Sequence, residues 1–183
     1  PVGPFITERI GIPTFILNDV RSITWGEYEF GAGKGCNSMV MYAIGTGIGG
    51  GVVINKQLVL GNSGQAGEIG HMTVEPNGTL CNCGNHGCLE QYASGPAIRA
   101  AALKAIAHGA TTILGEMVDY DLNKMTPEVV FNAALKGDEI AKNIYETAGY
   151  YLGIAIGNSI VQLEPERIVI GGGIAQAGEI LFA

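Results

Sequence analysis

The stretch Glu68–Glu90 reads EIGHMTVEPNGTLCNCGNHGCLE, and it holds three of the four cysteines of the chain. Cys81, Cys83 and Cys88 form a C-x-C-x4-C cluster with two glycines between the second and third cysteine. These glycines let the backbone fold back, so the three thiols can meet in a tight knuckle. Tetrahedral Zn²⁺ takes four sulfur and nitrogen ligands, so we expect one histidine to complete a Cys3His site.

The fourth ligand has two candidates, His71 and His86. His86 lies between two cysteines, where a small chelate loop would be strained, whereas His71 would tie the knuckle to the preceding segment. We therefore predict zinc ligation by His71, Cys81, Cys83 and Cys88. A disulfide is the weaker alternative, because Cys81 and Cys83 are poorly placed to bridge each other and the chain carries no sign of secretion. The spacing leaves open whether the knuckle is purely structural.

Two carboxylates flank this cluster and suggest that it also helps to bind a ligand. Glu68 precedes His71 by three residues, and Glu90 follows Cys88 by two. A metal that gathers the four ligands would draw both carboxylates toward the same small volume. Carboxylates beside a closed metal site suit hydrogen bonding to the hydroxyls of a polyol, so Glu68 and Glu90 are candidate ligand-binding residues.

Composition disfavours several classes of function. Of the 183 residues, 47% are hydrophobic and 15% charged, which suits one folded domain, or one and a part, and not a disordered chain. The net charge of −7 disfavours nucleic acid and anionic membranes as partners. The sequence has neither a signal peptide nor an apolar run long enough to span a bilayer, which predicts a cytoplasmic location. Both ends look cut, so we expect a fragment of a longer protein.

Asn18 and Asp19 are the next candidate site residues. Thr14–Leu17 is predicted to be a short strand and Val20–Phe30 a helix. Side chains at the carboxyl end of such a strand face the edge where α/β proteins place ligands. The alternative is that the pair caps the helix, which these residue types do well. The two roles are compatible, because a capping pair can still present one carboxylate to a cleft.

The glycine-rich run GTGIGGG at Gly45–Gly51 follows a predicted buried strand, 38–44, and leads into another, 51–54. Strand, turn and strand make a hairpin, whereas Rossmann and Walker A loops lead into a helix. Five glycines in seven residues exceed the needs of a turn. Bare backbone N–H groups can cradle phosphate oxygens, so we expect phosphate contact here, and a hairpin without ligand is the alternative.

The second half of the chain is predicted to be mainly helical. We expect helices over 94–107, 126–137 and 138–163, each opened by a capping residue, followed by a strand at 167–170. Gly149, Gly153 and Gly157 recur every four residues in the last helix and predict a smooth stripe for close backbone approach. The Gly171–Gly173 run after the final strand is a weak signal for a nucleotide.

Taken together, these motifs resemble those of the ROK family of repressors, open reading frames and sugar kinases, and most of all its bacterial ATP-dependent glucokinases. The likeness covers nearly the whole chain. Its most specific part is the pairing of EIGH at 68–71 with CNCGNHGCLE at 81–90. The resemblance implies an α/β, ribonuclease H-like fold of the actin and hexokinase type, with two lobes and a cleft between them.

The resemblance also implies roles for single residues. Asp19 matches the general base that takes a proton from the sugar's primary hydroxyl. The sugar-holding residues are matched by Asn18, Asp19, Glu68, His71 and Glu90. The turn that contacts the phosphates is matched by Gly45, Thr46 and Gly47, and the adenosine region by Gly171, Gly172 and Gly173. Zinc would then be structural, Mg²⁺ would arrive with ATP, and the protein would be a homodimer.

Two features of the family are missing from this sequence. The first is an Asp-x-Gly-Gly-Thr turn that grips phosphate and Mg²⁺ from the small lobe, and the second is the closing segment of the large lobe. We therefore expect residues 1–36 to be the end of the small lobe and residues 37–183 to be most of the large lobe, truncated at its C-terminus. Such a segment alone should be a poor kinase.

Three functions compete. The first is an ATP-dependent hexose kinase, with glucose favoured over fructose, mannose or an N-acetylhexosamine. The second is the sugar-sensing domain of a ROK-family repressor, which would carry a helix-turn-helix ahead of this region. The third is a zinc-stabilised α/β scaffold without activity. Cys36 has no assigned role in any of them.

Overall fold

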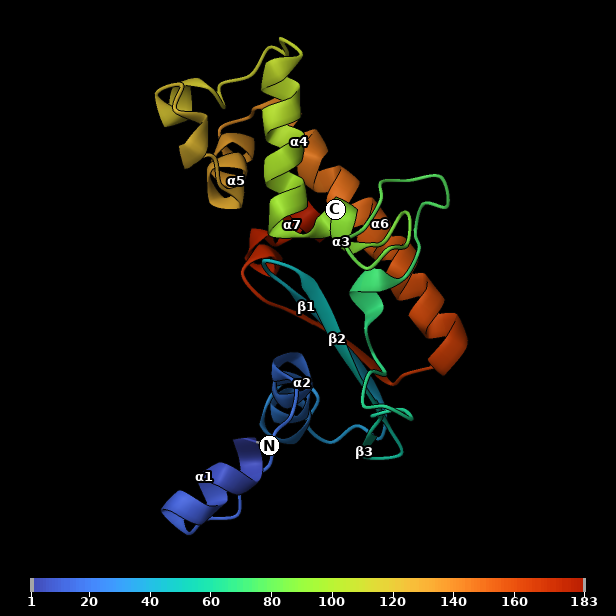
Figure 1. Cartoon of the computed structure of the whole chain (residues 1–183). Coiled ribbons are helices and arrows are strands. Elements are labelled where there is room, and N and C mark those ends of the chain that lie inside the picture. The colour runs from blue at the N-terminus through green and yellow to red at the C-terminus, as the bar shows by residue number, and fades with distance from the viewer. Residues whose placement is uncertain (1, 183) are drawn as a thin grey trace.

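The fold is built on the hairpin that the glycine-rich run predicted. In the computed structural model, which describes residues 2–182, β1 (Met39–Ile44) pairs antiparallel with β2 (Ile48–Ile54). β2 pairs with the short β3 (Gln57–Leu58), and β4 (Arg167–Gly171) lies parallel to β1. The sheet order is therefore β3-β2-β1-β4 (Figure 1).

Helices surround this sheet and fill the rest of the chain. The α-helices are α1 (Val2–Ile10), α2 (Asp19–Phe30), α3 (Glu90–Ala93), α4 (Gly95–Ala107), α5 (Pro127–Leu135), α6 (Glu139–Leu163) and α7 (Glu179–Phe182). Short 3-10 helices are η1 (Ile69–His71), η2 (Glu116–Val118), η3 (Leu122–Lys124) and η4 (Ile174–Ala177). The predicted helices α2, α4, α5 and α6 are confirmed, whereas α1 was not anticipated.

The sheet separates two hydrophobic layers. Along β1, Val40, Tyr42 and Ile44 join the larger core with α3 to α7, whereas Met39 and Met41 join a smaller core with Trp25 of α2. This alternation follows the two-residue period of a strand, and burial on both faces explains why β1 is apolar throughout. In Figure 1, α2 accordingly lies on one side of the hairpin and α6 on the other.

Helix α6 is fixed to the sheet by a buried polar contact. The Tyr42 hydroxyl donates to the Ala155 carbonyl oxygen at 2.8 Å and lies 2.6 Å from Ser159 Oγ. The predicted glycine stripe is confirmed at Gly149, where a Cβ would lie 2.1 Å from the Leu181 carbonyl oxygen of α7. No described atom lies within 4 Å of a Cβ at Gly153 or Gly157.

The predicted strand at Thr14–Leu17 is wrong. These residues form no regular element, and Phe15 is 91% exposed. A strand needs a neighbour for its backbone hydrogen bonds, and none of the described strands pairs with this segment. An apolar run alone was therefore insufficient evidence for a strand.

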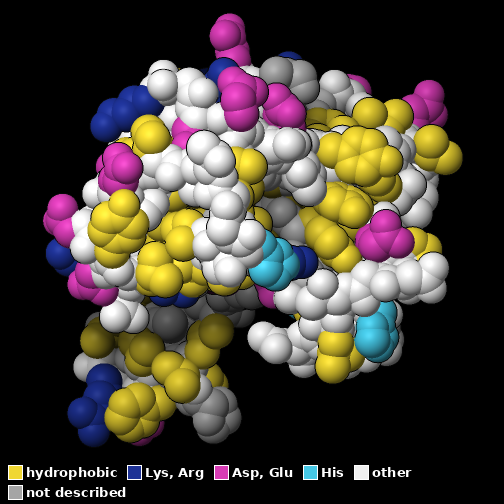
Figure 2. Space-filling view, turned by 90° about the horizontal axis from the view of Figure 1, so that it is seen from above, with side chains coloured by type: hydrophobic (Ala, Val, Ile, Leu, Met, Phe, Trp, Pro, Cys, Tyr) yellow, Lys and Arg dark blue, Asp and Glu magenta, His cyan; other side chains and the backbone are white. Residues whose placement is uncertain are grey.

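The surface carries both exposed hydrophobic side chains and acidic side chains. Figure 2 shows hydrophobic side chains exposed in separate patches on one face, with acidic side chains around them. Phe30 and Val161 are among the most exposed hydrophobic residues, at 85% and 87%. Among the described residues no helix combines the length and the hydropathy that crossing a bilayer requires.

Candidate functional site

Candidate residues from distant parts of the sequence line one cavity beside the β1–β2 turn. The cavity has a volume of ≈ 400 Å³, within the range of small-molecule sites. Its lining includes Asp19, the turn Gly45–Gly47, Glu68, His71, Glu90 and Gly172. The structure thus brings together four predicted polar side chains and the predicted phosphate turn.

Helix α2 presents Asp19 from its first turn. Asn18 is the N-cap, and its side-chain Oδ1 accepts a hydrogen bond from Arg21 N at 3.1 Å. Asp19 Oδ1 accepts from Val20 N at 2.9 Å, and the residue stays exposed and lines the cavity. The capping interpretation therefore holds for Asn18, which is not part of the cavity lining, while Asp19 faces the site.

The glycine run serves two different purposes. Gly45 N donates to Gly47 O at 2.9 Å across the turn, and Thr46 at its tip is exposed. Gly49, Gly50 and Gly51 instead lie within β2, beneath α2 and η1. A Cβ at these three positions would lie 2.5, 2.2 and 2.2 Å from the nearest side-chain atom. Close packing therefore accounts for three of the glycines that suggested a phosphate cradle.

Glu90 is held against the turn by two complementary features. It is the first residue of α3, and its Oε2 accepts a hydrogen bond from Ile48 N at 2.9 Å. A Cβ at Gly47 would lie 2.6 Å from the same oxygen. The glycine thus makes room for the carboxylate, which links α3 to the start of β2.

Glu68 has a partner that the sequence did not reveal. Arg21 Nη2 lies 3.1 Å from Glu68 Oε1, and the guanidinium also donates to the Ala66 carbonyl oxygen from Nε at 3.2 Å and Nη2 at 2.9 Å. Arg21 is 5% exposed. Arg21 shares the buried face of α2 with Thr24, three residues further along. Charged helix residues usually face solvent, so the sequence offered no signal for this burial.

The cysteine cluster forms as predicted. The ligand atoms of His71, Cys81, Cys83 and Cys88 all lie within 4.8 Å of one another. Cys81 Sγ is 3.6 Å from His71 Nδ1, and Cys83 Sγ is 3.6 Å from Cys88 Sγ. A tetrahedral zinc site with Zn–S bonds of about 2.3 Å and a Zn–N bond of about 2.1 Å would separate its ligand atoms by about 3.6–3.8 Å. The donor set and its spacing therefore fit zinc.

The other histidine of the loop lies elsewhere. His86 is exposed, and its Nδ1 is 3.1 Å from the Gly78 carbonyl oxygen. The cysteines are free thiols in the described part of the chain. Cys36 is buried, with its Sγ donating to Gly33 O at 2.8 Å.

The thiols differ in acidity because their surroundings differ. Burial raises the pKa of Cys88 to about 12, and the neighbouring Cys83 and Cys81 add to the effect. A backbone hydrogen bond at Asn85 lowers the pKa of the exposed Cys83 thiol. Three closely spaced thiols resist ionising together, and a divalent cation removes that conflict by binding the thiolates.

Two further cavities adjoin the turn and the late glycines. One, of ≈ 460 Å³, shares Gly45 and Thr46 with the first cavity and is also lined by Arg99 and Ile174. The next, of ≈ 530 Å³, includes Gly173 and Tyr145 in its lining. Gly172 lines the first cavity, whereas Gly171 lies in β4 and is not among the residues lining these three cavities. The late glycines are therefore divided between neighbouring spaces.

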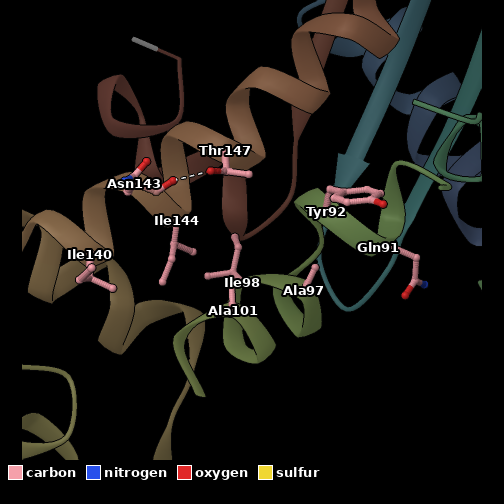
Figure 3. Close-up of a pocket in the computed structure, with 9 residues that line it drawn as sticks. All are labelled: Gln91, Tyr92, Ala97, Ile98, Ala101, Ile140, Asn143, Ile144 and Thr147. Carbon is pink, nitrogen blue, oxygen red and sulfur yellow. Dashed lines mark hydrogen bonds between the residues drawn. The ribbon is translucent and has the colours of Figure 1, made fainter. Parts of the chain in front are cut away.

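A separate groove lies between α3, α4 and α6 (Figure 3). Its volume is ≈ 340 Å³, and its lining is mixed, with Tyr92, Ile98 and Ile144 among the nonpolar members. The Thr147 hydroxyl turns back to donate to the Asn143 carbonyl oxygen at 2.7 Å (Figure 3). None of the predicted site residues lines this groove.

The fold and the grouped motifs define a class of protein. The chain belongs to the ROK family, whose model matches residues 1–183. The chain is 40% identical over 184 residues to the glucokinase of Halalkalibacterium halodurans, covering 100% of this chain and 55% of that relative. It spans about half the length of the curated glucokinases that it matches.

Solved structures agree on the fold and point to two kinds of relative. A ROK family glucokinase from Streptomyces griseus, in complex with glucose and AMPPNP, matches with 35% identity and a TM-score of 0.84, over 99% of this chain and 59% of that one. A ROK family transcriptional regulator, a homolog of the E. coli MLC protein, matches with 36% identity and a TM-score of 0.88, over 99% and 44%. The predicted actin and hexokinase type of α/β fold is confirmed.

Proposed function

We propose that this protein phosphorylates a hexose with ATP and that glucose is its preferred substrate. The observation that carries the proposal is the meeting of Asp19, Glu68, His71 and Glu90 in one cavity beside the glycine turn. The similarity to glucokinases, one of them solved with glucose and AMPPNP, supports the same activity. A set of three carboxylates and an imidazole suits a polyhydroxylated neutral ligand.

Asp19 would act as the general base. Its exposed carboxylate lines the cavity, where it can accept the proton of the sugar's primary hydroxyl. As the proton leaves, the hydroxyl oxygen forms a bond to the γ-phosphorus of ATP, and the bond from that phosphorus to the bridging oxygen breaks to release ADP. Mg²⁺ bound with ATP would neutralise charge on the phosphates. Positioning and electrostatic stabilisation supply most of the catalysis in such transfers.

The remaining polar residues would bind and orient the sugar. Glu68, Glu90 and His71 can each bond ring hydroxyls from the cavity lining. Asn18 would join them through its amide group from the position next to Asp19, although its side chain does not line the cavity here. Only one oxygen of Glu90 is engaged by Ile48 N, which leaves the other for a hydroxyl. The same His71 would ligate zinc through the nitrogen that faces Cys81, so the metal would hold the imidazole in place.

The nucleotide would occupy the neighbouring cavities. The turn Gly45–Gly47 would contact the phosphates, because it lines the first cavity and shares Gly45 and Thr46 with the next one. Thr46 and Gly47 would offer their backbone N–H groups, whereas the N–H of Gly45 already donates to Gly47 O and holds the shape of the turn. Gly171, Gly172 and Gly173 would accommodate the adenosine. Sugar and phosphates would then meet at the turn, within reach of Asp19.

The proposal includes the two-lobe division and a homodimer. Residues 1–36, with α1 and α2, would end the small lobe, and 37–183 would form most of the large lobe with the zinc loop. α2 packs on β2, so the two parts meet beside the cavity. Light scattering on the intact protein tests the dimer.

An ADP-release assay tests the activity. Glucose, fructose, mannose and N-acetylglucosamine are compared on the intact protein, and glucose should give the highest kcat/KM. Asp19→Asn should lower kcat by at least about a hundredfold while sugar affinity changes little, because the base acts in the chemical step. A full rate in Asp19→Asn would refute the assignment of the base, and equal rates for all sugars would refute the glucose preference.

The second candidate is the sugar-sensing domain of a transcriptional repressor. The regulator that matches with a TM-score of 0.88 favours it. A sensor needs the sugar cavity but not the base. Hexose binding by calorimetry without ADP release, together with DNA binding by the intact protein, would support this candidate against the kinase.

A further inference from the structure

Arg21 stands out as the buried charged residue whose contacts lead directly to the candidate sugar cavity. Its side chain is 6% exposed, and long charged side chains are rarely buried unless they are paired. The three hydrogen bonds that its guanidinium makes to described residues all reach residues 66–68. One of them ends on the Glu68 carboxylate, whose side chain is 47% exposed and lines the cavity.

Arg99 provides a comparison within the molecule, because its guanidinium bonds a distant loop without reaching a carboxylate. Arg99 also bonds a distant segment, with Nε donating to Met125 O at 2.9 Å and Nη2 to Leu122 O at 3.4 Å, but both acceptors are backbone carbonyls. Arg21 uses a carbonyl as an anchor and directs a further N–H to a carboxylate at the site. A planar guanidinium fixes the geometry between two such acceptors, which an ammonium group cannot do.

We propose that Arg21 is a positioning residue that orients the Glu68 carboxylate for the sugar hydroxyls. The proposal rests on the hexose-binding function proposed above. With Oε1 held by Arg21, the carboxylate has less freedom to lose when the sugar binds, and such preorganisation raises affinity. Arg21 also follows Asp19 by two residues in α2. One helical turn therefore carries both the candidate base and the residue that pairs with Glu68.

Substitution of Arg21 should therefore change sugar recognition beyond any loss of stability. Arg21→Met should raise the sugar Kd, and the KM for sugar, about tenfold, because a hydrogen bond that orients a charged group is lost. The KM for ATP should stay unchanged. Arg21→Lys should recover only part of the affinity. Thr24→Ala is the matched control, since Thr24 is fully buried on the same helix and its hydroxyl donates to Val20 O within that helix. This substitution should lower the melting temperature but not the sugar affinity.

A double-mutant cycle with Glu68→Gln shows whether Arg21 acts through Glu68. Sugar Kd is measured by calorimetry on the intact protein, alone and with each single and double substitution. In the Glu68→Gln background, adding Arg21→Met should change the Kd less than twofold, because there is no charged group left to orient. If Arg21→Met does not fold, Arg21→Lys takes its place in the cycle.

The outcomes are distinct. Equal Kd changes from Arg21→Met and Thr24→Ala, or full additivity with Glu68→Gln, would reduce Arg21 to a structural role while leaving the proposed function intact. Absence of hexose binding and turnover in the unsubstituted protein would overturn the proposed function and the role of Arg21 with it.

Discussion

Replacing Gly51 with alanine tests why β2 contains consecutive glycines. A Cβ at this position would lie 2.2 Å from Thr24 Oγ1 and 2.6 Å from Thr24 Cβ. Thr24 is fully buried in α2, and its β-branched side chain has few alternative rotamers. The clash therefore cannot be relieved by rotating a flexible side chain, and α2 has to move away from the sheet.

The cost can be estimated from this geometry. Ordinary contacts between carbon atoms are about 3.5–4.0 Å long, so α2 would have to shift by roughly 1 Å. Overpacking of this kind costs about 1–3 kcal/mol, and we expect the upper half of that range because the obstacle is close to the helix backbone. In a protein of this size the melting temperature should fall by about 4–12 °C.

Gly26→Ala is the matched control on the same helix. No described atom lies within 4 Å of a Cβ at Gly26, and alanine in a helix interior is about 0.5–1 kcal/mol more favourable than glycine. Urea unfolding followed by far-ultraviolet circular dichroism should therefore show opposite changes for the two variants. If Gly51→Ala is as stable as the unsubstituted protein but binds ATP more weakly, the packing explanation is wrong and the glycine contacts phosphate after all.

Two further predictions concern the metal and α6. Cys88→Ser should lose the expected one equivalent of zinc in elemental analysis, whereas Cys36→Ser should keep it; retained zinc in Cys88→Ser would contradict the ligand set. Burial alone would raise the pKa of Asp138. Hydrogen bonds from Ala141 N, Ile113 N and the Thr112 hydroxyl outweigh this effect, so the pKa lies below its usual value. The resulting stability is present above the unfolded pKa of about 3.9 and is lost as pH falls through the lower folded pKa. Asp138→Asn should therefore cost about 1–3 kcal/mol near neutral pH, with a smaller deficit below about pH 4 in thermal unfolding; a deficit independent of pH would refute this.

The sequence was most informative where chemistry and spacing are local. The cysteine spacing predicted the cluster, and strain in the short loop favoured His71, which lies with the cysteines, over His86, which does not. Capping residues predicted the helix starts after Ser94 and Asp138 to the residue. In each case the determining atoms lie within a few residues or belong to a strongly preferred ligand set.

The sequence was least informative where contacts span the fold. The segment Thr14–Leu17 has the composition of a strand but forms no regular element, because strand formation depends on a neighbour that the sequence does not specify. The buried state of Arg21 depends on a carbonyl at Ala66, 45 residues away. The roles of Asp19, Glu68 and Glu90 remain predictions, because the structure shows only that they share a cavity.

The first turn of α2 has a consequence for engineering this protein. An α-helix turns by about 100° per residue. Inserting or deleting one residue there would therefore rotate Asn18, Asp19 and Arg21 together relative to the rest of the helix. The helix cap, the carboxylate in the cavity and the ion pair with Glu68 would all be disturbed by this one change. A chimera whose chain differs by one residue in length at the start of this helix should therefore lose all three contacts at once. A functional chimera has to exchange residues 18–21 as a block, along with the 66–68 segment that receives the guanidinium.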